Sequence, residues 1–212
     1  EPFATVELFI DGTSIGSTTT GDNGSWSFDY SGTDLAEGTY SLTATAIDVA
    51  GNVSTYSQPV SITIDTTVPG APSITSISSD TGTADDGITS DNTISFAGTA
   101  ELNTTVRLYL GETLIGTTTV DGGGAWTFDY AGTTLEDGNY TVRAWATDIA
   151  GNTSNTSTDF ALIIDSSISA PTITGISDDD GASDSDGITS DSQLIFSGTA
   201  EENAKVEVFL DG

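Results

Sequence analysis

The sequence predicts an all-β protein made of tandem β-sandwiches, and two observations lead to that prediction. Short stretches in which apolar and polar residues alternate recur along the chain, and such alternation is typical of half-buried strands. The chain also repeats itself after 100 residues, since residues 40–46 (YSLTATA) return as residues 140–146 (YTVRAWA). A period of that length is large enough to bury a core of its own, unlike the shorter repeats of solenoids.

The repeat divides the chain into one complete and two partial domains. We predict a complete repeat at residues 69–168, the later part of a repeat without its first two strands at residues 1–68, and the opening strands of a third at residues 169–212. Two explanations of the partial repeats stay open: the chain continues on both sides, or strands from neighbouring chains complete them.

Turn signals separate seven alternating stretches within the complete repeat. Pro72 ends the linker before the first, Gly111-Glu112 makes a short loop between the third and fourth, and the glycines at 122–124 supply a turn before the fifth. The predicted strands are Ser73–Ile77, Thr93–Ala97, Thr105–Leu110, Leu114–Thr118, Trp126–Tyr130, Tyr140–Ala146 and Asp159–Ile164.

Seven short strands in about 100 residues are typical of an immunoglobulin-like sandwich. Tyr40 and Tyr140 begin the sixth strand of their repeats, where a tyrosine corner would lie. Cysteine is absent, so the fold is not an antibody-type domain, and a fibronectin-type strand order stays open.

The charge balance excludes several partners. The chain has 32 Asp and Glu against 3 Lys and Arg, a net charge of −29. Nucleic acids and anionic membranes would be repelled, whereas divalent cations are natural counter-ions. No stretch of about 18 apolar residues predicts membrane insertion of this segment, and no signal-peptide pattern occurs in it, so we expect an export signal to lie outside it.

The absence of Cys and His narrows the chemistry further. No disulfide staples the domains, so in a secreted protein a metal is the usual substitute. Zinc is disfavoured without its preferred ligands. The chain has a single lysine, Lys205, and its acids fall on loops rather than in a cleft, so we expect no enzyme.

Alternating strand directions gather acids where one repeat would follow another. The linker residue Asp65 is carried toward the loops that contain Glu101, Asp148 and Asn152, and Asp165 is carried toward Glu201. Carboxylate, amide and backbone oxygens are the ligands that Ca²⁺ prefers. The sequence therefore predicts calcium sites at the junctions.

A second predicted calcium site lies within one long loop and recurs in the third repeat. Several like charges in one loop repel unless a cation lies among them. The alternative is that these acids are solvated and keep the chain soluble, because turns favour Asp for conformational reasons alone. The candidate ligands are Asp80, Asp85, Asp86 and Asp91, repeated as Asp179, Asp184, Asp186 and Asp191.

The phrases GITSDNT, GTAE, GAWTF, LEDGNYTV, TDIAGN and IDSS resemble the bacterial immunoglobulin-like repeats of large type I-secreted, biofilm-type adhesins. The resemblance covers the whole chain. It implies calcium-stiffened extender domains on a bacterial cell surface, which hold a distant ligand-binding tip away from the cell. The resemblance extends to the junction residues named above, whereas the glycines at 122–124 and one extra residue before Gly187 depart from the pattern.

Two functions other than that of an extender domain are also consistent with the sequence. A polymerising fibre subunit would be completed by strands of neighbouring chains, laterally or head to tail. A carbohydrate-binding module would use Tyr109 and Trp145, which point outward beside Arg107 and Arg143. Ordinary cross-strand pairing with a cation–π contact explains that outward face equally well and is favoured.

Overall fold

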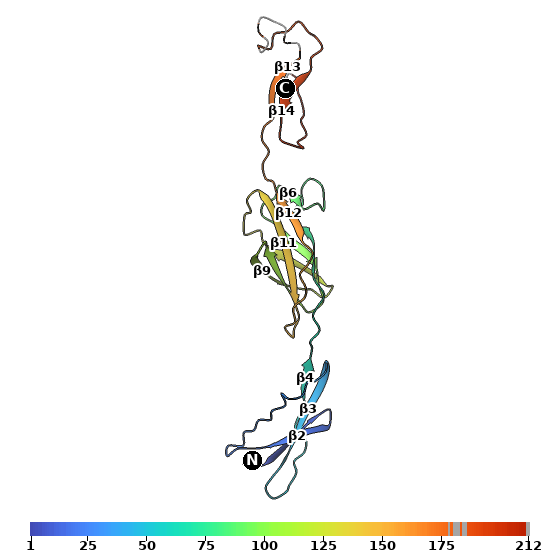
Figure 1. The fold of residues 1–212 in the computed structure, drawn as a ribbon, viewed down its shortest axis with the longest axis vertical. Coiled ribbons are helices and arrows are strands. Elements are labelled where there is room, and N and C mark those ends of the chain that lie inside the picture. The colour runs from blue at the N-terminus through green and yellow to red at the C-terminus, as the bar shows by residue number, and fades with distance from the viewer. Residues whose placement is uncertain (178, 180–182, 184–185, 211–212) are drawn as a thin grey trace. The chain divides into compact units, whose positions relative to one another are not determined.

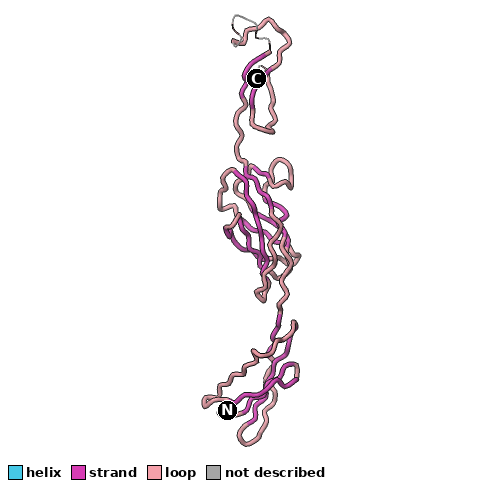
Figure 2. Tube along the Cα trace, viewed as in Figure 1, coloured by secondary structure: helices cyan, strands magenta, loops and turns pink. Residues whose placement is uncertain are grey.

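The computed structural model describes residues 1–177, 179, 183 and 186–210, and these residues form strands and loops without a helix (Figures 1 and 2). Within that described part, no helix is long and apolar enough to cross a membrane. Two compact units are present: residues 1–69 with the loop 147–153, and the remainder. The all-β prediction is confirmed.

Residues 1–69 contain one antiparallel sheet of order β2-β1-β3-β4. A hairpin with a two-residue turn joins β1 to β2, and both turn residues, Asp11 and Gly12, have positive φ. Residues 25–29 are the counterpart of a strand in the complete repeat but form none here, because the strand with which that counterpart pairs has no equivalent in residues 1–69. The strands are β1 (Thr5–Ile10), β2 (Thr13–Thr19), β3 (Gly38–Ile47) and β4 (Val60–Ile64).

The complete repeat is a sandwich of two sheets, ordered β10-β7-β5 and β6-β12-β11-β8-β9. Its third and sixth predicted strands are neighbours, as expected. The strands are β5 (Ser73–Ile77), β6 (Ile88–Thr89), β7 (Ser95–Thr99), β8 (Thr105–Leu110), β9 (Thr113–Thr119), β10 (Ala125–Asp129), β11 (Gly138–Thr147) and β12 (Phe160–Ile164).

The core of this sandwich lies between the alternating inward residues of both sheets. Val142, Ala144 and Ala146 on β11 are completely buried, as their period-2 spacing predicts. Burial of such side chains is the main driving force for the fold. The other members of the core are Ile77, Ile94, Phe96, Val106, Leu108, Trp126, Leu135, Leu162 and Ile164.

The structure contains one short strand, β6, that the sequence pattern does not predict. β6 has two residues and pairs in parallel with β12, through Ile163↔Ile88 and Ile164↔Thr89. The backbone N–H groups of Ile163 and Asp165 donate to the Gly87 and Thr89 carbonyls at 2.9 and 3.0 Å. The outer edge of β12 is therefore covered, and an uncovered edge would invite pairing with another chain.

Serine side chains replace a strand beside β11. Ser157 Oγ accepts the Ala144 N–H at 3.0 Å while the Ser157 N–H donates to the Ala144 carbonyl at 2.8 Å. Ser154 does the same for Ala146. An irregular segment thus satisfies the backbone groups of a buried strand.

The described part of the third repeat forms the antiparallel pair β13 (Thr172–Ile176) and β14 (Phe196–Thr199). Residues 205–210 form no strand, although their counterparts in the other two repeats are β1 and β8.

Candidate functional site: the acidic linkers and loops

At the start of each linker between repeats, linker residues donate hydrogen bonds to a carboxylate from the loop that precedes β3 or β11. Glu37 Oε1 accepts the Thr66 N–H at 2.9 Å and the Thr67 hydroxyl at 2.6 Å. Asp137 Oδ1 accepts the Ser166 N–H at 3.0 Å and its hydroxyl at 2.7 Å. We call this arrangement the carboxylate clamp. It was missed in the sequence analysis, and the signal that could have found it is the acid before Gly in both repeats.

Hydrogen bonding of the ionised form lowers the pKa of each clamp carboxylate. The pKa of Glu37 is lowered chiefly by the Thr67 hydroxyl, with help from the Thr66 N–H. The pKa of Asp137 is lowered first by the Ser166 hydroxyl and then by its N–H. Both groups are therefore acceptors in their charged state, and each orders the first residues of a linker.

A second carboxylate meets each linker near its end. Glu101 Oε2 accepts the Gly70 N–H at 2.9 Å, and Glu201 Oε2 accepts the Ser169 N–H at 3.1 Å. Both glutamates belong to the repeated phrase GTAE and follow the strands β7 and β14. The two predicted glutamates thus contact linker backbone.

The loop after β11 is a tight turn closed by Asp148 and Asn152. Asp148 Oδ1 accepts the Asn152 N–H at 2.8 Å, and Asp148 Oδ2 accepts Asn152 Nδ2 at 2.9 Å. Burial raises the pKa of Asp148, but the bonds from the Asn152 side chain and backbone outweigh it, and the pKa is lowered overall. Asn152 Nδ2 also donates to the Asp65 carbonyl at 3.0 Å, so the predicted amide contacts the linker through its nitrogen.

Asp165 and Glu201 line one small hollow of about 230 Å³. Ser90, Ser166, Ser167 and Ile168 complete its lining. The hollow therefore joins two predicted calcium ligands with three further hydroxyl-bearing residues, and oxygen is the atom type that a hard cation requires.

The long acidic loop contains one carboxylate oxygen without a donor. Asp80 Oδ2 accepts the Asp85 N–H at 2.7 Å, whereas Asp80 Oδ1 is buried and has no hydrogen-bond partner among the described residues. In the third repeat Asp179 Oδ2 accepts the Gly187 N–H at 3.1 Å, and Asp179 Oδ1 is buried without a hydrogen-bond partner in the part of the chain that the structure describes. A buried polar atom without a hydrogen-bond partner requires an explanation, and ligation of a cation is one.

Four other acids of these loops accept hydrogen bonds in local turns, whereas Asp85 contributes its backbone N–H to Asp80. Asp86 and Asp91 each accept the backbone N–H two residues on, at 2.9 Å, as Asp186 and Asp191 do at 3.1 and 2.8 Å. Such turns use Asp without any metal. The predicted ligand Asp184 lies outside the described residues. Across the described residues, no three acidic side chains converge closely enough to hold a metal ion by themselves.

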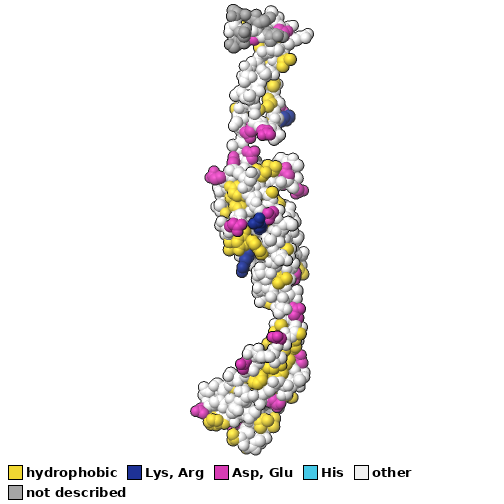
Figure 3. All heavy atoms as spheres, viewed as in Figure 1, with side chains coloured by type: hydrophobic (Ala, Val, Ile, Leu, Met, Phe, Trp, Pro, Cys, Tyr) yellow, Lys and Arg dark blue, Asp and Glu magenta, His cyan; other side chains and the backbone are white. Residues whose placement is uncertain are grey.

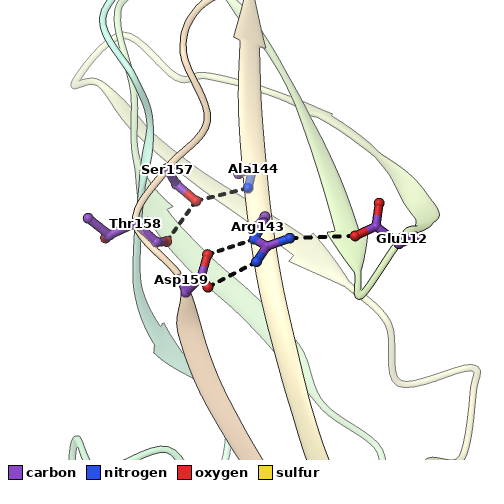
Figure 4. A network of polar contacts seen from close by, with 6 residues as sticks. All are labelled: Glu112, Arg143, Ala144, Ser157, Thr158 and Asp159. Carbon is purple, nitrogen blue, oxygen red and sulfur yellow. Dashed lines mark hydrogen bonds and ion pairs between the residues drawn. The ribbon is translucent and has the colours of Figure 1, made fainter.

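The outer face of β11 carries polar and aromatic contacts rather than acids alone. Arg143 Nε and Nη2 donate to the two Asp159 oxygens at 2.6 and 3.0 Å, and Arg143 Nη1 lies 3.6 Å from Glu112 Oε1 (Figure 4). The Tyr109 and Trp145 rings meet edge to face, with centroids 4.4 Å apart. Figure 3 shows basic side chains beside apolar and acidic ones on this repeat.

Comparison with known proteins identifies the family. A family model described as the bacterial Ig-like domain matches residues 1–66 and again residues 67–166. The chain belongs to the bacterial Ig-like domain family. The predicted tandem immunoglobulin-like sandwich and the resemblance to bacterial Ig-like repeats are thereby confirmed, and no curated protein matches the chain.

Three solved structures are similar to this bacterial Ig-like chain. One is the Ca²⁺-stabilized adhesin with which an Antarctic bacterium binds ice: 29% identity over 84% of this chain and 44% of that one, TM-score 0.42. Another is a 1.5-MDa bacterial ice-binding adhesin, with 28% identity over 77% of this chain and 53% of that one and a TM-score of 0.37. The third is a tetra-tandem repeat from the extending region of a large adhesion protein, with 25% identity over 83% of this chain and 44% of that one and a TM-score of 0.35. The chain spans about half the length of these structures.

Proposed function

We propose that this chain is an extender segment of a bacterial cell-surface adhesin or extracellular fibre, with a mechanical rather than catalytic role. Calcium bound at the linkers would limit rotation between successive repeats. The partners of each repeat are then its neighbours in the same chain. Membership of the bacterial Ig-like family and the tandem arrangement of the repeats support this proposal.

The observation that carries the proposal is that, near both ends of each linker, a backbone N–H group donates a hydrogen bond to a carboxylate. Glu37 and Glu101 contact the first linker, and Asp137 and Glu201 contact the second. A linker that served only as a flexible tether would be a solvated Gly- and Ser-rich coil. Backbone bonds to fixed side chains instead reduce the conformations open to the linker, which suits a spacer of defined length.

Calcium fits the side chains at the second linker. Asp165 and Glu201 share one hollow with three serines, and water and backbone carbonyls can complete a shell of about six to eight oxygens. At the first linker the proposed ligands are Asp65, Glu101, Asp148 and Asn152. Asn152 would contribute its amide oxygen, because its nitrogen already donates to Asp65 and Asp148.

Calcium fits the long loop through Asp80, whose buried Oδ1 has no donor among the described residues. A bound cation would supply the missing partner and offset the charge of neighbouring acids. Asp179 would play the same part in the third repeat. Asp85, Asp86 and Asp91, with Asp184, Asp186 and Asp191, are the remaining proposed ligands of these two loops.

Calcium titration of the whole chain tests the proposal. The double variant Asp165→Asn/Glu201→Gln removes both acids of the hollow, and we expect it to lose one bound ion in isothermal titration calorimetry. The matched control Asp22→Asn/Asp34→Asn removes the same charge from two exposed loop residues and should keep every site. Equal stoichiometry in both variants, or no binding by the unmodified chain, would contradict the proposed site.

A further inference from the structure

The outer face of the complete repeat gathers two of the chain's three basic residues with two aromatic ones. Arg107 and Tyr109 alternate with completely buried residues of β8, so their side chains lie on the outer face of the sheet. Arg143 and Trp145 alternate in the same way with buried residues of the neighbouring strand β11. Arginine, tyrosine and tryptophan are enriched at the centres of protein interfaces, so this face is a candidate interaction surface.

The two arginines of this face differ in their contacts. Arg143 donates to both carboxylate oxygens of Asp159 and lies 3.6 Å from Glu112, as Figure 4 shows. Arg107 is exposed and forms no ion pair with any of the described residues. One positive charge on this face is therefore available to a partner from outside the repeat.

The other two repeats have glutamate at the position of Arg107, and each glutamate has a local partner. Glu7 Oε1 accepts the Ser14 hydroxyl at 2.8 Å, and Glu207 Oε1 accepts a hydrogen bond from Lys205 Nζ at 2.7 Å. The complete repeat reverses the charge at this position without adding a local partner for it. Its outer face thus differs from the equivalent faces of the other repeats in the way that an interaction surface specific to this repeat requires.

A complementary charge on the same face comes from Glu112, in the turn between β8 and β9. Its side chain is 97% exposed, and its distance of 3.6 Å from Arg143 Nη1 is longer than a hydrogen bond. Exposed ion pairs of this kind contribute little to stability, so Glu112 can change partners at small cost. Along the chain, Arg107 and Glu112 lie on either side of Tyr109, which places opposite charges around an aromatic centre.

We propose that this face binds the same face of a second copy of the chain, around a two-fold axis near Tyr109. Arg107 of each copy then pairs with Glu112 of the other, so the contact contains two equal ion pairs around an aromatic centre. An isologous contact requires one patch to carry both members of each pair, and this patch does so. The inference goes beyond the proposed extender function and does not depend on calcium.

A second copy fits this face better than a small anionic ligand does. Glu112 and Asp159 lie beside Arg143 and would repel a carboxylate or a phosphate, whereas in the two-fold contact Glu112 becomes a partner of the opposite arginine. The net charge of −29 on each copy opposes association at low ionic strength. At about 0.15 M salt, exposed charges more than about 8 Å apart are largely screened, so the charges paired at the contact dominate.

Sedimentation equilibrium of the whole chain at about 0.15 M salt, in the presence of chelator, tests the inference. The unmodified protein should form dimers of its 21.6 kDa chain as its concentration rises. Arg107→Glu and Glu112→Arg each bring like charges together twice, so each should weaken dimerisation about tenfold or more. The matched control Asp34→Arg changes the net charge as Glu112→Arg does, at an exposed loop residue of another repeat, and should dimerise like the unmodified chain.

Reversal of both charges separates this contact from non-specific association. The double variant Arg107→Glu/Glu112→Arg exchanges the members of each ion pair and should dimerise again. An equal mixture of the two single variants should form a mixed dimer, because both of its ion pairs again join opposite charges. Circular dichroism of each variant checks that these exposed substitutions leave the fold intact. A monomeric unmodified chain, dimerisation that neither single variant weakens, or a mixture of the single variants that stays monomeric would overturn the inference.

Discussion

Residues 1–68 and the complete repeat carry nearly the same strand sequences but bury them differently. Leu42 and Ala44 on β3 are half-buried, whereas their counterparts Val142 and Ala144 on β11 are completely buried. The strand pairings within the sheet are shared, since β1, β2, β3 and β4 pair as β8, β9, β11 and β12 do. The difference shows that sequence alternation sets the sheet, whereas burial requires the second sheet.

The outer faces of the two regions share an aromatic contact that different residues form. Tyr109 packs edge to face on Trp145, and its counterpart Phe9 packs in the same way on Tyr56, with centroids 5.2 Å apart. The partner ring comes from β11 in one repeat and from the segment after β3 in the other. Because different residues form the same aromatic contact in the two repeats, a packing role for Trp145 is favoured over a sugar-binding role.

The largest difference between the regions should appear at the equivalent tryptophans. Trp126→Ala should lower the free energy of unfolding of the complete repeat by about 3–5 kcal/mol, because the ring is buried in the core. Trp26→Ala should cost the monomeric chain less than about 1 kcal/mol, since nearly half of that ring is exposed. Denaturant unfolding followed by circular dichroism at low protein concentration measures both. Similar losses would mean that residues 1–68 have a core comparable to that of the complete repeat.

A smaller difference is expected at the serines beside β3 and β11. Ser157→Ala leaves the buried Ala144 N–H without its acceptor and should cost about 1–3 kcal/mol. Ser57→Ala removes the same bond at an exposed site, where water can replace it, and should cost less than about 0.5 kcal/mol. Amide hydrogen exchange at Ala144 and Ala44 reports each effect directly. Equal losses of protection would show that the added sheet does not shield this edge.

The smallest expected effect concerns pH and the carboxylate clamps. The folded-state pKa of Asp137 lies below its unfolded value of about 3.9, so its contribution to stability is present above that value and disappears as the pH falls through the folded pKa. The Ser166 amide resonance should therefore shift with a midpoint below about 3.9 in an NMR titration. Thr66 should respond in the same way to Glu37, whose pKa is also lowered. Asp137→Asn should abolish the Ser166 response and leave that of Thr66 unchanged.

The strands could be predicted from the sequence because their patterns are local. Alternating residues such as those of β11 reveal both a strand and its buried face. β6 could not be predicted this way, since two residues are too few for a pattern and their pairing with β12 depends on a distant segment. Residues 25–29 show the converse, because a clear strand pattern forms no strand where its partner is missing.

The candidate site could be predicted only in part. Turn chemistry placed Asp148 and Asn152 together, and topology placed Asp165 near Glu201. The carboxylate clamp of Glu37 and Asp137 was missed because it depends on how the linker returns past a loop some 30 residues earlier in the chain. The local turns in which Asp86 and Asp91 accept backbone N–H groups could not be separated from ion ligation by sequence spacing, so their place among the proposed calcium ligands stays a prediction.

Small-angle X-ray scattering of the whole chain in calcium and in chelator tests the proposed extender function most directly. Ionic strength must be matched, and the protein must be kept at low concentration so that contacts between chains do not contribute. We expect a narrower distribution of interatomic distances at long range in calcium, a broader one in chelator, and unchanged circular dichroism. Indistinguishable scattering in the two buffers would contradict calcium-dependent stiffening of the linkers.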